Sequence, residues 1–251
     1  MLTSQRKALI LETLRRDGQV IAKRMAEEFE LSEDTIRRDL REMAAEGLLQ
    51  RVHGGAMPLS PPLPDFSTRR TVAPADKARL GARAAAMILP GQMVFLDGGT
   101  STAEVARALP RDLPVTIVTH SPTIAAELEH HPLAEIILIG GKLYRHSMVA
   151  TGAMAMAAIS MLRPDIFFLG VTAVHAARGL STGDAEEAAI KRHIAACSAE
   201  THVLLTAEKF DAASPCLVMP LADLAGMIVP AEMDELRLKP YREQGLSIIA
   251  A

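Results

Sequence analysis

The stretch that decides the fold of the first part of the chain is SEDTIRRDLREMAAEGLLQRVHGGA, residues 32–56. It opens on Ser32, a residue type that caps helices by accepting a hydrogen bond from a free amide of the first turn. The two acidic residues that follow suit the positive end of a helix dipole. Ile36, Leu40 and Met43 repeat at helical spacing and define an apolar face. The pattern therefore predicts a capped amphipathic helix.

The residues on either side of this helix complete a small domain. Gly47 ends the helix, residues 50–52 alternate like a strand, and Gly54-Gly55 allows a tight turn, which together predict a small β-hairpin. Upstream, residues 4–17 and 22–29 have the apolar spacing of two further helices. Three helices followed by a hairpin are typical of a winged helix-turn-helix, whose third helix enters a DNA groove.

Charge alone does not identify a DNA-binding surface here. Residues 1–57 hold ten Lys/Arg and ten Asp/Glu, so their net charge is zero and any affinity for DNA must come from local arrangement. A pair of arginines on a helix is usually only a solvated face. The ordered cap, apolar stripe, glycine break and hairpin nevertheless favour DNA binding. The candidate DNA-binding residues are Ser32, Thr35, Arg37, Arg38, Arg41, Arg51 and His53.

A domain boundary is visible in the composition. Residues 57–64 read MPLSPPLP, with four prolines in eight positions, and such a segment is expected to be extended and semi-rigid. We therefore expect a DNA-binding domain at 1–57, a linker and connecting arm at 58–75, and a larger domain at 76–251. Within the linker region, residues 66–75 form the arm.

From residue 76 onward, short apolar runs alternate with helical patterns, which predicts a mainly parallel α/β sheet that is buried on both faces. The expected strands are 93–96, 115–118, 136–139, 166–169, 203–205, 227–229 and 247–249. The expected helices between them are 77–88, 102–109, 121–129, 152–162 and 186–198.

Ligands of such sheets bind at the carboxyl ends of the strands. Four predicted strands end in glycines and hydroxyls: Asp97-Gly98-Gly99-Thr100-Ser101-Thr102, Thr119-His120-Ser121, Gly140-Gly141-Lys142 and Gly170-Val171-Thr172. Glycines let the backbone approach a ligand closely, and free amides at a helix start bind anions, above all phosphate. One such turn is usually just a tight turn, but several at one sheet edge indicate a phosphate-bearing ligand.

Three charged residues are expected near the same edge. A polar loop at 179–182 leads towards Glu187 and Lys191, which stand at i and i+4 on one helix face. Taken alone, this pair is more simply a surface ion pair. Lys209 follows the strand at 203–205 and can reach a bound phosphate.

The sequence resembles DeoR-type bacterial transcriptional regulators. The resemblance rests on TIRRDL at 35–40, EGLL at 46–49 and RVHGGA at 51–56, and it continues through most of the chain. It implies an N-terminal DNA-binding domain and a C-terminal domain, similar to ribose-5-phosphate isomerases and CoA-transferase-like folds, that binds a phosphorylated sugar, polyol or related metabolite. With the strand-end residues, the implied effector-binding set is Asp97, Gly98, Gly99, Thr100, Ser101, Thr102, Thr119, His120, Gly140, Gly141, Lys142, Glu187, Lys191 and Lys209.

Two departures from the family pattern bear on which sugar is bound. The family often has an Asp-Ser-Ser-Lys-Phe-like run, where this chain has TAEKF at 206–210, so that Ala207 and Glu208 precede the lysine. The family commonly has asparagine where His120 stands. Both changes affect the identity of the effector more than the existence of a pocket.

Composition agrees with a cytoplasmic regulator that associates with the nucleoid when bound to DNA. The 251 residues are 49% hydrophobic and carry a net charge of −3, and the two cysteines, Cys197 and Cys216, form no disulfide framework. We expect no signal peptide, no membrane span, no metal site and no cofactor, because neither a long apolar run nor a His/Cys cluster at metal spacing is present.

Two functions remain open at this point. The first is a repressor that binds double-stranded operator DNA as a homodimer or higher homo-oligomer and responds to a phosphorylated sugar or polyol. The alternative is a sugar-phosphate isomerase with an accessory N-terminal domain, in which Glu187 is the base and Lys191 or Lys209 is its electrostatic partner.

Overall fold

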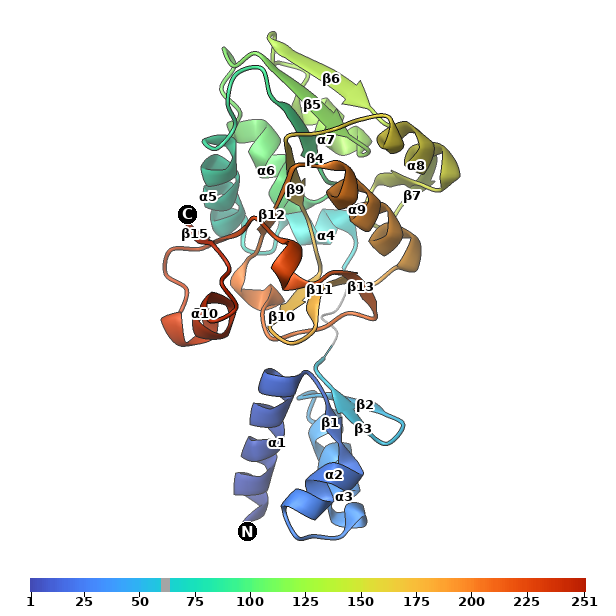
Figure 1. The fold of residues 1–251 in the computed structure, drawn as a ribbon, viewed down its shortest axis with the longest axis vertical. Helices are drawn as coiled ribbons and strands as arrows, with labels where there is room; N and C mark the ends of the chain where they lie inside the picture. Colours follow the sequence, from blue (N-terminus) through green and yellow to red (C-terminus); the bar gives the residue numbers. More distant parts are fainter. Residues whose placement is uncertain (60–63) are drawn as a thin grey trace.

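The computed structural model describes residues 1–59 and 64–251. Its N-terminal unit, at the bottom of Figure 1, has three helices and a three-stranded antiparallel sheet in the order β1-β3-β2. The elements are α1 (Thr3–Asp17), β1 (Val20–Ile21), α2 (Ala22–Glu28), α3 (Glu33–Ala45), β2 (Gln50–Val52) and β3 (Gly55–Met57). This is the predicted winged helix-turn-helix, with the short strand β1 as an addition that the sequence did not indicate.

The core of the N-terminal unit forms from the residues that the helical spacing singled out. Ile36, Leu40 and Met43 on α3 are each at most 1% exposed and pack with apolar residues of α1 and α2. The side chain of Ser32 accepts a hydrogen bond from the Thr35 amide at 3.3 Å and so caps α3 as predicted.

A buried ion pair joins the first and third helices. The Arg6 guanidinium on α1 forms a two-pronged contact with the Asp39 carboxylate on α3, and Nη2 to Oδ1 measures 2.9 Å. Both side chains are almost fully buried. Removing one partner of such a pair leaves an uncompensated buried charge, so Asp39 is expected to matter for the integrity of this unit rather than for contact with DNA.

The C-terminal part is built on a seven-stranded parallel sheet in the order β15-β14-β12-β9-β4-β5-β6. Its strands are β4 (Met93–Leu96), β5 (Val115–Thr119), β6 (Ala134–Leu138), β9 (Ile166–Leu169), β12 (Glu200–Leu204), β14 (Gly226–Val229) and β15 (Ile248–Ala250). All seven strands were predicted from short apolar runs, and the predicted α/β class is confirmed.

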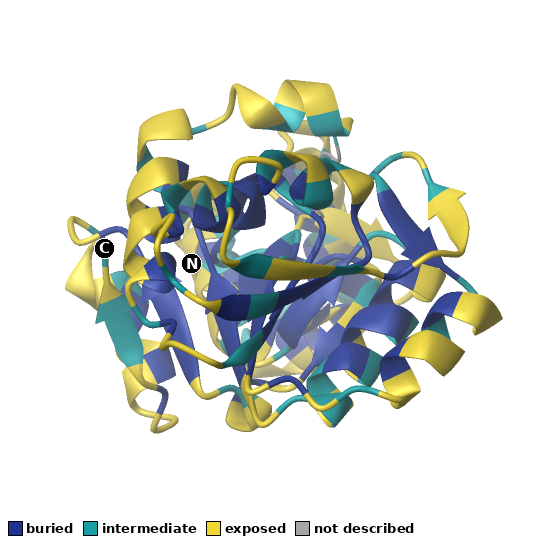
Figure 2. Ribbon diagram, turned by 90° about the horizontal axis from the view of Figure 1, so that it is seen from above, coloured by how far each residue is buried: buried dark blue, intermediate teal, exposed yellow. Residues whose placement is uncertain are grey.

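Helices cover both faces of this sheet (Figure 1). One face is covered by α5 (Pro74–Ala85), α6 (Thr100–Ala108) and α7 (Pro122–Glu127). The other face is covered mainly by α8 (Ala153–Ser160), α9 (Ala185–Cys197) and α10 (Glu235–Arg242). Viewed from above, the buried residues lie on the central strands and on the inward sides of the helices (Figure 2).

Several elements were not predicted from the sequence. They are the hairpin β7 (Lys142–Tyr144) and β8 (Val149–Thr151), the sheet of β10 (Ala173–His175), β11 (Gly179–Thr182) and β13 (Cys216–Met219), the helix α10, and the short 3-10 helices Ala207–Lys209 and Leu221–Asp223. The prediction of a polar loop at 179–182 is therefore wrong, because these residues form strand β11. These residues are buried because β11 is the central strand of its antiparallel sheet.

The connection between the two parts contains a short helix, α4 (Phe66–Arg70), inside the expected arm. The next helix, α5, starts at Pro74, two residues before the expected start of the larger domain. The extended conformation predicted for 57–64 falls partly on residues 60–63, which lie outside the described residues.

The turn between β10 and β11 touches the end of α1. The ring nitrogen Nε2 of His175 lies 2.9 Å from the Leu14 carbonyl, and Arg178 donates a hydrogen bond to the Gly18 carbonyl at 3.2 Å. Gly18 has a φ of +68°, and a Cβ there would lie 2.5 Å from Cγ of Arg178. The left-handed turn that ends α1 is thus also a contact with the C-terminal part.

None of the helices in the described ranges is long and apolar enough to cross a membrane.

We predict that Asp39→Ala destabilises the N-terminal unit by about 3–5 kcal/mol, because it leaves the Arg6 charge buried without a partner. Denaturant unfolding followed by circular dichroism measures the loss. Asp34→Ala, an exposed position on the same helix, is the control and is expected to change stability by less than about 1 kcal/mol. Equal stability of the two variants would contradict the prediction.

Candidate functional site

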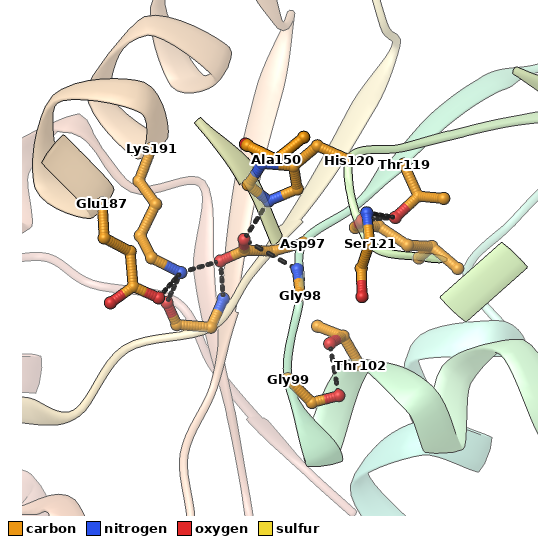
Figure 3. A network of polar contacts seen from close by, with 12 residues as sticks. Asp97, Gly98, Gly99, Thr102, Thr119, His120, Ser121, Ala150, Glu187 and Lys191 are labelled. Atoms are coloured by element: carbon orange, nitrogen blue, oxygen red, sulfur yellow. Dashed lines mark hydrogen bonds and ion pairs between the residues drawn. The ribbon is translucent and has the colours of Figure 1, made fainter. Parts of the chain in front are cut away.

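The carboxylate of Asp97 is the centre of a buried polar network at the carboxyl end of the sheet (Figure 3). It follows β4 and is fully buried. One oxygen accepts from the Gly98 amide at 2.8 Å and lies 2.9 Å from Nε2 of His120. The other accepts from the Gly170 amide at 2.8 Å and from Nζ of Lys191 at 2.5 Å. The network thus connects residues that follow β4, β5 and β9 with helix α9.

The charges of this network stabilise the ionised form of Asp97. Burial alone would raise the pKa of Asp97, but the nearby Lys191 and the hydrogen bond with His120 outweigh it and lower that pKa to about 2. His120 is itself enclosed, because its other ring nitrogen lies 3.0 Å from the Ala150 carbonyl and its ring meets Phe95 edge-on. Each ring nitrogen of His120 thus lies within hydrogen-bond distance of an oxygen atom, which fixes the orientation of the ring.

Glu187 and Lys191 are not the surface ion pair that their spacing alone suggests. They are 6% and 2% exposed, and Lys191 lies 3.4 Å from Glu187 while also donating to the Gly170 carbonyl at 2.9 Å. Burial raises the pKa of Glu187, but the charge of Lys191 and the Thr182 hydroxyl, which donates at 2.9 Å, bring it below its ordinary value. Glu187 is therefore ionised and fully engaged.

A cavity of about 270 Å³ lies beside this network. Its wall combines the loop and first turn of α6, the residues that follow β9, helix α9, the 3-10 helix after β12, and the arm between the two parts of the chain. The lining residues are Pro64, Arg69, Val72, Lys77, Gly98, Gly99, Thr100, Ser101, Thr102, Gly170, Val171, Thr172, Thr182, Glu187, Lys191, Glu208 and Lys209.

The cavity wall has an excess of positive charge. Four of its residues are cations and two are carboxylates, and Lys191 is already paired with Asp97 and Glu187. Lys209 is different, because the hydrogen bond that its ammonium forms within residues 1–59 and 64–251 is a long one of 3.5 Å to the Leu204 carbonyl. Burial lowers the pKa of Lys209 to about 8; Glu208 opposes the shift, and neighbouring cations add to it. A bound anion would therefore stabilise the charged form of Lys209.

The start of α6 gives the cavity a row of backbone amides. Gly98 and Gly99 precede the helix, and a Cβ at Gly98 would lie 1.9 Å from the Val149 side chain, so the close approach of the hairpin β7–β8 requires glycine there. The amides of a first helical turn have no partner within the helix, and together with the dipole they favour a bound anion. The cavity therefore combines free amides with cations.

The predicted effector residues separate into three groups. On the cavity wall lie Gly98, Gly99, Thr100, Ser101, Thr102, Glu187, Lys191 and Lys209. Behind the wall lie Asp97, Thr119 and His120, which are completely buried. Thr119 donates to the Leu96 carbonyl at 2.8 Å, so its hydroxyl supports the strand ends rather than facing the cavity.

The third group lies away from this cavity, contrary to expectation. Gly140, Gly141 and Lys142 were expected at the pocket because they follow a parallel strand, but they are exposed and do not line the cavity. The physical reason is their position at the edge of the sheet. β6 is the outermost strand, and the chain turns from its end into the hairpin β7–β8 instead of into a helix over the cavity.

Arg69 and Lys77 line the cavity but were missed in the sequence. Arg69 lies in the arm, and Lys77 lies on the first helix of the larger part, where a lysine gives no signal of its own. Lys77 is only 4% exposed and donates to the Arg69 carbonyl at 2.6 Å. The sequence gives no sign that this lysine, near the start of an alanine-rich helix, is buried rather than exposed to solvent.

The predicted DNA-binding side chains gather on one exposed surface of the N-terminal unit. Asp34, Thr35, Arg37, Arg38, Arg41 and Arg51 border a shallow hollow between α3 and the hairpin, and His53 is at the hairpin tip. Arg37 is held by Glu33 at 2.8 Å. In the described ranges, Arg38, Arg41 and Arg51 have no ion-pair partner, which leaves three guanidinium groups available on this surface.

Two family models match this chain, one in each part. Residues 6–61 match the DeoR-like helix-turn-helix domain, and residues 73–230 match the DeoR C-terminal sensor domain. The HTH-type transcriptional regulator GlpR of Haloferax volcanii is 29% identical over 99% of this chain and 98% of its own. The glycerol-3-phosphate regulon repressor of Escherichia coli is 32% identical over 84% of each chain.

Among solved structures, ribose 5-phosphate isomerase A of Methanocaldococcus jannaschii matches 53% of each chain at 16% identity, with a TM-score of 0.40. This likeness is too low to argue a shared activity.

We predict that Asp97→Asn destabilises the protein by about 3–5 kcal/mol, because the buried ammonium of Lys191 loses the carboxylate charge that compensates its own. The folded pKa of Asp97, about 2, lies below its unfolded value. The stability that Asp97 contributes is therefore present above about pH 4 and is lost as the pH falls through 2. Urea unfolding of wild type and variant at pH 7 measures the effect.

The matched control for this prediction is Asp223→Asn, an exposed position in the second 3-10 helix that forms no ion pair in the described structure. It is expected to unfold like the wild type. Wild-type stability of Asp97→Asn would show that the network is not what holds the strand ends together.

Proposed function

The chain belongs to the DeoR family of transcriptional regulators, and from this premise we propose that it is a repressor of a sugar or polyol catabolic operon that responds to a phosphorylated metabolite. The observation that carries the proposal is the pairing of two sites in one chain. One is an exposed arginine surface on a winged helix-turn-helix, and the other is a cavity with two excess positive charges in the sensor domain.

The DNA-binding part of the proposal rests on α3 and the hairpin. α3 is the recognition helix, since it follows the turn of the helix-turn-helix and presents Arg38 and Arg41 outward. An arginine fork can bind a guanine edge or clamp a phosphate. Arg51 and His53 on the hairpin contact the adjacent backbone. Arg37 must exchange Glu33 for DNA, so its contribution is smaller.

The effector part rests on charge. A phosphate monoester carries about −1.5 to −2 charges at neutral pH, which matches the two excess positive charges of the cavity. The free amides at the start of α6 and the ammonium of Lys209 are suited to its oxygens. A relative that is 32% identical over 84% of this chain is named for a glycerol-3-phosphate regulon, in agreement with a small phosphorylated ligand.

The isomerase alternative is not supported. Both named relatives are regulators. Glu187, its supposed base, is a carboxylate that already accepts a hydrogen bond from Thr182 and forms an ion pair with Lys191, and its lowered pKa makes it a poor proton acceptor. The residues that resemble an active site instead hold the wall of a binding cavity.

Control by the effector requires two arrangements with different affinity for DNA, because a ligand shifts an equilibrium only by its differential affinity for the two states. We infer that the protein acts as a homodimer or larger homo-oligomer. A two-fold arrangement doubles the contacts with a palindromic operator and fixes the spacing of its half-sites.

We predict that Arg38→Ala weakens binding to the operator by about 1–3 kcal/mol, because it removes a contact with a base edge. A gel-shift titration at fixed salt, against a DNA fragment that the wild-type protein selects from a random pool, measures the change. Arg15→Ala, an exposed arginine on α1 away from this surface, is the control. An unchanged operator affinity would remove Arg38 from the contact set.

We predict that the affinity for a phosphorylated effector falls about tenfold between pH 7 and pH 9, as Lys209 loses its proton with a pKa of about 8. A bound phosphate raises that pKa, so binding is favoured while Lys209 is protonated. Calorimetric titrations at several pH values test this.

Lys209→Met is expected to bind the same ligand more weakly and without that dependence on pH. A pH dependence equal to that of the wild type would assign it to another group.

A further inference from the structure

Arg69 is a cavity residue that comes from the connection between the two parts of the chain. It lies on α4, and the same segment adds Pro64 and Val72 to the cavity wall. α4 starts nine residues after the end of the hairpin that carries Arg51, so this wall of the cavity is covalently close to the DNA-binding unit. The other lining residues begin at Lys77 and lie farther along the chain from that unit.

The guanidinium of Arg69 is poorly satisfied where it lies. Its Nη2 donates to the His146 carbonyl at 3.1 Å, and its Cζ lies 5.9 Å from the ring centre of Phe66. Its Nε is buried and has no hydrogen-bond partner among the described residues, and no carboxylate of the described chain forms an ion pair with it. A guanidinium offers five N–H donors, so most of its capacity is unused.

The surroundings of Arg69 make this arrangement unfavourable without a ligand. Burial lowers the pKa of Arg69, and the more distant carboxylates of Glu187 and Asp97 only partly oppose that effect. A partly buried cation without a hydrogen-bonded anion carries a desolvation cost. An anionic oxygen in the cavity would remove this cost and use the empty donors.

The neighbouring residue, Arg70, shows that the lack of an anionic partner is specific to the position of Arg69. Arg70, next along α4, is exposed on the outer side of the helix and lies 3.7 Å from Glu127. Lys77 donates from α5 to the Arg69 carbonyl at 2.6 Å and so fixes the end of α4 against the cavity. One arginine of the pair is thus held inward, while the other has an ordinary surface partner.

We propose that Arg69 binds an anionic oxygen of the effector and that the arm thereby closes one wall of the pocket around the ligand. This inference rests on the proposed function and extends it. The effector contacts the segment that leads from the DNA-binding unit, so occupancy of the cavity fixes the position of α4. The segment from Pro64 to Val72 is then held in one of the arrangements between which DNA affinity differs.

The test uses the full-length protein as wild type, Arg69→Ala, Arg69→Lys and Arg70→Ala. The probes are inorganic phosphate, glycerol 3-phosphate and ribose 5-phosphate, with glycerol and ribose as uncharged controls. Isothermal titration measures affinity, and melting temperature without ligand shows that each variant is folded. For each probe that the wild type binds, Arg69→Ala is expected to lose roughly tenfold to hundredfold in affinity.

The remaining variants separate a binding role from a structural one. Arg69→Lys keeps the charge but not the fork, so its affinity is expected to lie between those of wild type and Arg69→Ala. Arg70→Ala is expected to bind like the wild type. Should Arg69→Ala fail to fold, the comparison of Arg69→Lys with Arg70→Ala still decides, because only the former should weaken binding.

The outcomes distinguish this inference from the proposed function. Wild-type affinity in both Arg69 variants, beside a wild type that binds a phosphorylated probe, would overturn the inference and leave the phosphorylated effector standing. A wild type that binds none of the phosphorylated probes would overturn the effector class, and the role of Arg69 with it.

Discussion

The buried carboxylate of Asp97 is the interaction on which the rest of the sensor domain depends. Its two oxygens take hydrogen bonds from the residues that follow β4, β5 and β9 and from Lys191 on α9. Four elements far apart in the sequence are thereby fixed at one point. A buried charge is tolerated only when it is paired and fully hydrogen-bonded, and this requirement leaves the strand ends little freedom. The cavity lies next to a rigid structure as a result.

The charged residues divide into those of the buried network and those of the cavity wall, and this explains how the site can be stable and still bind an anion. In the network, Lys191 is paired with both Asp97 and Glu187, and the ring of His120 lies against the other oxygen of Asp97. The cations that remain on the cavity wall have weaker partners. They are carbonyl oxygens for Lys77 and Arg69, and a long contact for Lys209. The attraction for an anion thus comes from Arg69, Lys77 and Lys209, which line the cavity but do not belong to the Asp97 network.

Much of the fold was predictable because parallel strands buried on both faces are short apolar runs, and the cap, stripe and glycines of residues 32–56 admit few alternatives. The site was predictable only in part. Spacing indicates that a residue follows a strand, but not whether its side chain faces the cavity, as Thr100 does, or supports it from behind, as Thr119 and His120 do. The edge position of β6, which moves Gly140 and Gly141 away, depends on strand order. Arg69 could not be found because its position depends on contacts with residues far along the chain, such as the His146 carbonyl that accepts from its guanidinium.

The hairpin of β10 and β11 connects the cavity wall with the first helix of the DNA-binding unit over a short distance. Its base carries Thr172 and Thr182 on the cavity wall, and its tip carries His175 and Arg178 against the end of α1. Three residues of extended chain span about 10 Å. The cavity and the first helix of the DNA-binding unit are therefore about as far apart as two neighbouring helices. A displacement of these threonines at one end of the β10–β11–β13 sheet therefore has only about this distance to cross before it reaches the contact with α1.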